Sequence, residues 1–278
     1  MGRHNMDSKA QYFEYVEEIE KTVRARHDPS VIRTTPLAAR SNAKVKAPKQ
    51  CPEVLQYPNP LPEVLRPIAI DCDTPPEVLR EGIIGMLLGQ AVGDAVGLST
   101  EFMMKAQAQW FYGGEVISYD HYLIDNHRSH WMGEDFRCAD WTDDTDQCIL
   151  LLDSLVHNNG EADPKDFARR CLFWSNFGFP EVGDLFPLGC GWTFSTVVRT
   201  KGWLDDPIGV ARKKWMEGGC QAAANGSVMR TSVAAVPYFW DTKRVVDNAV
   251  TMGQITHADP RCNSSVATAV ARSEERRV

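Results

Sequence analysis

The sequence predicts an all-α protein. Asp163-Pro164 and Asp206-Pro207 each open a segment of helical periodicity, and Gly178 and Gly218 stand where those segments would end. Long period-two runs are absent from the sequence, as are hairpin turns between alternating apolar segments, so strands are not expected. No repeat of solenoid length is visible. We therefore expect helices packed around a core rather than a sheet or a repeat array.

The composition indicates a folded protein that does not bind nucleic acid. The chain has 278 residues, of which 43% are hydrophobic and 24% charged, enough for a packed core in one large domain or two small ones. The first 50 residues carry ten Lys or Arg against six Asp or Glu, and the remainder carries twenty against thirty-one. The acidic remainder offers no basic face for a nucleic acid. An anionic nucleotide would need metals, helix N-termini or backbone N–H groups.

The cysteines and the N-terminus favour a cytoplasmic, reducing location. The N-terminus has no apolar segment typical of a signal peptide, and the eight cysteines are scattered without a C-x-x-C pair. Cys148 and Cys171 lie in apolar helical patterns, which predicts buried thiols. The longest apolar run is too short for a membrane span and contains Asp94, so no membrane association is expected.

The chain divides near residue 73. We expect residues 1–73 to form an N-terminal extension, with a polar helix over 10–26 and a proline-rich, basic linker over 27–72. The helical domain should then occupy residues 74–278. Its first helix should begin at Pro75-Pro76 after a Thr or Asp cap and continue to Gly97.

Glycines recur every four residues along this first helix. Each costs about 1 kcal/mol against alanine in a helix interior. Such a stripe indicates that another backbone or a ligand comes close to it. Its members are Gly85, Gly89, Gly93 and Gly97.

The next helix should begin within the run Trp-Thr-Asp-Asp-Thr-Asp-Gln at 141–147, because an apolar run follows at 149–152. Two interpretations of its acidic start remain open. The residues can cap the helix and favour its positive end, with Asp144 and Gln147 spaced as a capping box. Alternatively, the hydroxyl of Thr142 and the carboxylates of Asp143 and Asp144 can bind a hard cation such as Mg²⁺ or Mn²⁺.

Four further helices follow. The first runs from Asp163-Pro164 to Gly178, and the second from Asp206-Pro207 to Gly218-Gly219. Thr242 can cap the third, and residues 264–272 begin the fourth. The third should turn its apolar residues inward, namely Val245, Val246, Ala249, Val250 and Met252.

Four stretches in order resemble the ADP-ribosylglycohydrolase family over residues 78–270. They are Gly-Gln-Ala-Val-Gly-Asp-Ala-Val-Gly at 89–97 with Glu101 beyond it, Trp-Thr-Asp-Asp-Thr-Asp at 141–146, Asn-Gly-Ser-Val-Met-Arg at 225–230 and Thr-His-Ala-Asp-Pro at 256–260. The resemblance implies a single orthogonal multi-helix domain with two Mg²⁺ or Mn²⁺ ions. It also implies hydrolysis of ADP-ribosylated proteins or ADP-ribosyl small molecules.

The resemblance also implies roles for individual residues. Thr142, Asp143 and Asp144 would be metal ligands. Glu101 and Asp144 would be the catalytic carboxylates, and Glu101 would take the proton of the attacking water. The substrate would lie against Gly189, Gly191, Ala222, Ala223, Asn225, Gly226, Ser227 and His257.

Simpler interpretations remain for several of these residues. Glu101 can be an ordinary helix-end acid, Asn225-Gly226 a plain turn, and His257 the end of a helix before Pro260. His121, His127 and His130 lie in a polar segment without the ordered spacing of metal ligands, so no site is expected there.

The C-terminus departs from the family pattern. Members carry a second acidic cluster, Asp-x-Asp-Thr, near that end, and this sequence has none before Val278. The sequence therefore leads us to expect a domain truncated at its C-terminus. Three functions follow: a metal-dependent hydrolase, a catalytically impaired ADP-ribose-binding pseudoenzyme without the second metal cluster, or a fold retained for packing alone.

Overall fold

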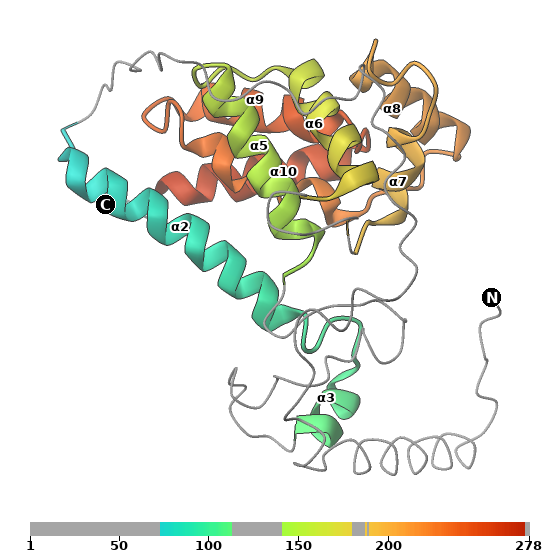
Figure 1. The fold of residues 1–278 in the computed structure, drawn as a ribbon, viewed down its shortest axis with the longest axis horizontal. Coiled ribbons are helices and arrows are strands. Elements are labelled where there is room, and N and C mark those ends of the chain that lie inside the picture. The colour runs from blue at the N-terminus through green and yellow to red at the C-terminus, as the bar shows by residue number, and fades with distance from the viewer. Residues whose placement is uncertain (1–72, 113–140, 180–186, 188, 276–278) are drawn as a thin grey trace. The chain divides into compact units, whose positions relative to one another are not determined.

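Helices make up the part of the chain that the computed structural model describes, which is residues 73–112, 141–179, 187 and 189–275 (Figure 1). No strand occurs in these ranges, so the all-α prediction is confirmed. The predicted helix at 10–26, the linker and the three histidines of 121–130 lie outside the described residues. The helices are α2 (Pro76–Gly97), α3 (Lys105–Tyr112), α5 (Asp143–His157), α6 (Pro164–Phe177), α7 (Trp192–Val198), α8 (Pro207–Glu217), α9 (Thr242–Gln254) and α10 (Pro260–Glu275), with short 3-10 turns η4 (Asn225–Ser227) and η5 (Thr231–Ala235).

The core lies between α5, α6, α9, α10 and η5. α9 packs along α10, and α5 packs against α6 and η5. Burial raises the pKa of the Cys148 thiol to about 11 and that of Cys171 to about 12, as expected for inert core thiols. The largest fully buried apolar side chains are Trp174, Trp203, Phe167, Leu150, Leu151, Leu155, Met252 and Ile255. None of the described helices combines the length and apolar character that a membrane crossing requires.

Most predicted helix ends are confirmed, because short-range capping sets them. Asp163 accepts from the backbone N–H groups of Lys165 and Asp166, and Asp206 accepts from Gly209. Two caps differ from the prediction. Asp241, not Thr242, caps α9 through the N–H of Arg244, so Thr242 is the first helical residue. α2 begins after Pro75 with no side-chain cap, since proline has no group that could accept.

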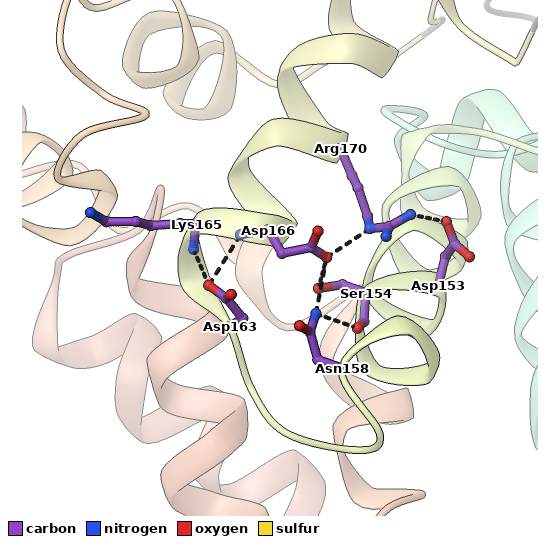
Figure 2. A network of polar contacts seen from close by, with 7 residues as sticks. All are labelled: Asp153, Ser154, Asn158, Asp163, Lys165, Asp166 and Arg170. Carbon is purple, nitrogen blue, oxygen red and sulfur yellow. Dashed lines mark hydrogen bonds and ion pairs between the residues drawn. The ribbon is translucent and has the colours of Figure 1, made fainter. Parts of the chain in front are cut away.

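A polar network around the buried Asp166 and Arg170 of α6 fastens this helix to α5 (Figure 2). The Asp166 carboxylate accepts from Ser154 Oγ at 2.7 Å, Asn158 Nδ2 at 3.2 Å and Arg170 Nε at 2.8 Å. Arg170 is 1% exposed and also pairs with Asp153 on α5. This network fixes the spacing between α5 and α6, two of the helices that form the core.

The glycine stripe of α2 does not meet a neighbour among the described residues. A Cβ built on Gly85, Gly89, Gly93 or Gly97 would have no other atom of the described residues within 4 Å. The predicted close backbone approach is therefore not found in this part of the chain. α2 instead attaches through its polar residues Gln90 and Asp94, described next.

Candidate functional site

The start of α5 is a capped helix terminus. Thr142 is the N-cap, and its Oγ1 accepts from the backbone N–H of Asp144 at 3.3 Å. The capping interpretation is therefore confirmed for Thr142. The Asp144–Gln147 capping box is wrong, because Gln147 Nε2 donates to Asp143 Oδ2 at 3.0 Å instead. Thr142 and Asp143 are both buried, while Asp144 is partly exposed.

Asp94 of α2 holds this helix start in place. Its Oδ2 accepts from Thr142 N at 3.0 Å, Thr145 N at 3.0 Å and Thr145 Oγ1 at 2.7 Å. Its Oδ1 accepts from Thr142 Oγ1 at 2.9 Å. A carboxylate that accepts helix N-terminal N–H groups is favoured both by charge-assisted bonding and by the helix dipole. Sequence reasoning assigned no role to Asp94, although a lone acid in an apolar, glycine-rich helix was the available signal.

Gln90, one turn before Asp94, makes a second attachment. Its Nε2 donates to the Met229 carbonyl at 2.8 Å and reaches the Asp144 carbonyl at 3.4 Å, while its Oε1 accepts from Ser232. The polar residues of the 89–97 stretch therefore join α2 to the start of α5 and to the 229–232 turn. Glu101 lies in the turn that follows α2, seven residues beyond Asp94 and partly exposed.

Asp146 has a structural role. Its Oδ1 accepts from the indole N–H of Trp141 at 2.9 Å, and its Oδ2 accepts from the indole N–H of Trp174 at 3.0 Å. Both carboxylate oxygens are thus used to tie α5 to Trp141 and to α6. Of the acidic run, Asp143 and Asp144 are left as the candidate ligands.

The donor set at the start of α5 suits one hard divalent cation. Thr142, Asp143 and Asp144 place a hydroxyl and two carboxylates in three consecutive residues, and Mg²⁺ is commonly bound through one or two carboxylates with water or substrate oxygens completing the shell. Within the ranges that the structure describes, no three or more His, Cys, Asp or Glu side chains gather as a metal-binding cluster.

The predicted phosphate segment and the predicted histidine meet. Residues 221–225 are exposed, and the chain then enters η4, where Ser227 is buried. A Cβ built on Gly226 would lie 3.0 Å from His257 Nε2, so a larger residue would require the imidazole to shift. Two stretches some 30 positions apart in the sequence therefore form one surface.

Arg230 connects this surface to α5. The guanidinium is fully buried; Nη1 donates to Gln147 Oε1 at 2.6 Å and Nη2 donates to Thr256 Oγ1 at 2.7 Å. Thr256 Oγ1 lies 2.8 Å from His257 Nδ1. A continuous line of hydrogen bonds thus runs from Asp143 through Gln147, Arg230 and Thr256 to His257. Burial, with the Arg230 charge adding to it, lowers the pKa of His257 to about 3, so the imidazole is neutral at pH 7.

The loop around Gly189 and Gly191 lies beside a small pocket. Gly189 has φ 79°, a conformation that favours glycine, and Gly191 is the N-cap of α7. The pocket has a volume of about 230 Å³, and Cys190, Ser175, Ser195 and Arg199 are among its lining residues. Burial raises the pKa of Cys190 to about 12, with further contributions from the nearby charges of Asp143 and Asp146.

Comparison with known proteins gives consistent matches. A family model described as ADP-ribosylglycohydrolase matches residues 75–274. The chain is similar to the ADP-ribosylarginine hydrolase Tri1 of Pseudomonas putida, with 28% identity over 197 residues that cover 69% of this chain and 46% of that protein. An uncharacterized protein of Archaeoglobus fulgidus is 27% identical over 196 residues, covering 69% of this chain and 55% of its own length. The uncharacterized protein YegU of Escherichia coli is 32% identical over 98 residues, covering 34% of this chain and 27% of its own length. The chain thus spans about half the length, or less, of the curated relatives it matches.

Proposed function

The chain belongs to the ADP-ribosylglycohydrolase family, and from that premise we propose that it is a metal-dependent hydrolase of the glycosidic bond in ADP-ribosylated proteins or related ADP-ribosyl compounds. One observation carries this proposal. The acidic start of α5 and the turn at 225–227 with His257 are the two ends of a single buried hydrogen-bond line. Two motifs with separate chemical tasks are therefore held in fixed relation.

We propose arginine-linked ADP-ribose as the substrate class. The motive is the likeness to a protein named ADP-ribosylarginine hydrolase. In that reaction the oxygen of water forms a bond to the anomeric carbon of the ribose, and the bond from that carbon to the guanidine nitrogen breaks. The proton lost by the water goes to a carboxylate, and the leaving guanidine gains a proton in its turn. The transition state has oxocarbenium character, so nearby carboxylates stabilise it.

Glu101 and Asp144 are the proposed groups for this proton transfer. A carboxylate can accept a proton from water while the new carbon–oxygen bond forms. Asp144 lies in the first turn of α5, and Glu101 follows the helix whose Asp94 is bonded to that turn. Mg²⁺ or Mn²⁺, when bound by Thr142, Asp143 and Asp144, would orient the water and stabilise developing negative charge.

The opposite end of the line is the proposed diphosphate and ribose surface. Ala222, Ala223, Asn225 and Gly226 offer backbone N–H groups on an exposed segment, and small side chains let phosphate oxygens come close to them. This mode of binding suits an acidic chain, because it needs no basic side chains. His257 closes the back of the turn at Gly226.

Release of free ADP-ribose tests the proposal. The full chain is incubated with arginine-ADP-ribosylated protein in Mn²⁺ or Mg²⁺, and parallel reactions contain a chelator or a substrate linked through a serine oxygen. We expect release from the arginine-linked substrate that the chelator abolishes. Binding of ADP-ribose without turnover would instead identify the chain as a pseudoenzyme. If the folded chain shows neither turnover nor binding, both functions are rejected.

A further inference from the structure

Burying the charged side chain of Arg230 costs folding free energy. It is fully buried, and no described carboxylate forms an ion pair with it; its side chain bonds to Gln147, Thr256 and the carbonyls of Met252 and Gly253, with Phe167 beneath the guanidinium. An unpaired buried cation is unfavourable compared with an apolar side chain of similar size. The distinctive property of arginine is that it only donates hydrogen bonds. This property determines the direction of the hydrogen bonds on both sides of Arg230, toward Asp143 and toward His257.

Toward α5, Arg230 fixes the orientation of an amide. Because the guanidinium only donates, the Gln147 atom facing it at 2.6 Å must be the acceptor Oε1. The Nε2 of the same amide then faces Asp143 and donates to Oδ2 at 3.0 Å. A flipped amide would place two donors against each other and leave Asp143 without this bond. The polarity is therefore set by chemistry.

Toward His257, Arg230 fixes the position of a proton. Thr256 Oγ1 accepts from Arg230 Nη2, and the only acceptor that the described residues offer to the Thr256 hydroxyl proton is His257 Nδ1, at 2.8 Å. If Nδ1 accepts, the single proton of the neutral ring must lie on Nε2. Nε2 lies beside Gly226, and the hydrogen bond found for this ring among the described residues is the one through Nδ1.

We propose that Arg230 is a positioning residue: through Thr256 it locks His257 in the tautomer with the proton on Nε2, and so presents a hydrogen-bond donor to an acceptor oxygen of a ligand at the 225–227 turn. A hydroxyl or phosphate oxygen of an ADP-ribosyl group meets that requirement, so the identity of the ligand rests on the function proposed above. The tautomer itself does not.

The tautomer can be measured directly by nitrogen NMR on the full chain with labelled histidine. The chain has seven histidines, and the spectrum of His257→Asn identifies the signals of this one by their loss. At pH 7 we expect His257 Nε2 to be protonated and Nδ1 not. A proton on Nδ1, or an equal mixture of tautomers, would overturn the proposal.

Matched variants separate the hydrogen-bond line from general damage. Thr256→Val keeps the shape but removes the hydroxyl, so the tautomer preference should be lost; Thr256→Ser should restore it. Thr251→Val makes the same change on α9, where the hydroxyl bonds only the Asp247 carbonyl, and should leave His257 unchanged. If Thr256→Val does not fold, Arg230→Met supplies the same test from the other side of the hydroxyl. A tautomer that persists in whichever variant folds would contradict the proposed role.

Binding of ADP-ribose gives the second readout. Loss of one neutral hydrogen bond corresponds to about a two- to tenfold rise in Kd, expected in Thr256→Val and reversed in Thr256→Ser. If wild type shows the predicted tautomer but binds no ADP-ribose, the proposed function fails and the role of Arg230 stands. If ADP-ribose binds but the tautomer is the other one, the role of Arg230 fails alone.

Discussion

Replacing Asp94 should release the start of α5 and destabilise the whole domain. Its carboxylate accepts four hydrogen bonds, two from backbone N–H groups and two from the hydroxyls of Thr142 and Thr145, each of which is 4% exposed. A bond to a charged group contributes about 1.5–3 kcal/mol when buried. Asp94 is itself partly exposed, so water can replace some of these bonds, and alanine is the better helix former. We therefore expect Asp94→Ala to lower the free energy of unfolding by about 3 kcal/mol.

Denaturant unfolding at pH 7 measures this effect, and Asp163→Ala provides the matched control. Asp163 likewise accepts from the N–H groups of a helix start, but only from two of them, both in its own helix. Its loss should cost about 1 kcal/mol, as for an ordinary N-cap. Asp94→Asn, which keeps an acceptor but not the charge, should fall between the two alanine variants. If Asp94→Ala costs no more than Asp163→Ala, the attachment of α2 to α5 does not stabilise the fold as described.

Three further predictions concern pH, packing and metal. The pKa of His257 is lowered to about 3 in the folded state, so the imidazole takes up a proton when the chain unfolds at mildly acidic pH. The free energy of unfolding is therefore highest above the ordinary pKa near 6.5 and should fall by about 2 kcal/mol between pH 7 and pH 5. Urea titrations should show this loss in wild type but not in His257→Asn. Asp166→Ala leaves the buried Arg170 with one carboxylate fewer and should cost about 3 kcal/mol in the same assay. Mn²⁺ should raise the Tm of the wild type, and alanine at both Asp143 and Asp144 should abolish that rise.

Each of these predictions has an outcome that opposes it. A pH dependence that is the same in wild type and His257→Asn would mean that folding does not lower the pKa of the imidazole. An Asp166→Ala cost below 1 kcal/mol would mean that Arg170 finds a new partner. A Tm response to Mn²⁺ that survives without Asp143 and Asp144 would place the ion elsewhere.

Local signals in the sequence were enough to predict most of the helices. Asp163-Pro164 and Asp206-Pro207 mark helix starts through bonds made within three residues, and α6 and α8 begin there. Four short elements were not predicted, namely the helices α3 and α7 and the 3-10 turns η4 and η5. They are too short for periodicity to reveal, and η5 lies where the core packs, with Val233 and Ala234 fully buried.

Only part of the candidate site could be predicted, because some of its residues are connected by contacts that only the folded chain makes. Residue types with obvious chemistry, such as Asp143 and His257, stand out in a sequence. Asp94 and Arg230 do not, because their partners lie 48 and 83 positions away and only the fold brings them together. Gln147 was interpreted as part of a local capping box for Asp144, whereas its amide carries a long-range connection. Contacts between residues so far apart in the sequence depend on how the helices pack, and the periodicity of the sequence does not reveal that packing.

Calorimetric titration of ADP-ribose into the full chain with Mn²⁺ tests the central claim most directly, namely that the start of α5 and the 225–227 turn with His257 line one ligand site. The account predicts a single binding event that is weakened both by Asp143→Ala, at one end of the hydrogen-bond line, and by His257→Ala, at the other. Binding that is unaffected by one of these changes, or no binding by a chain shown to be folded, would contradict it.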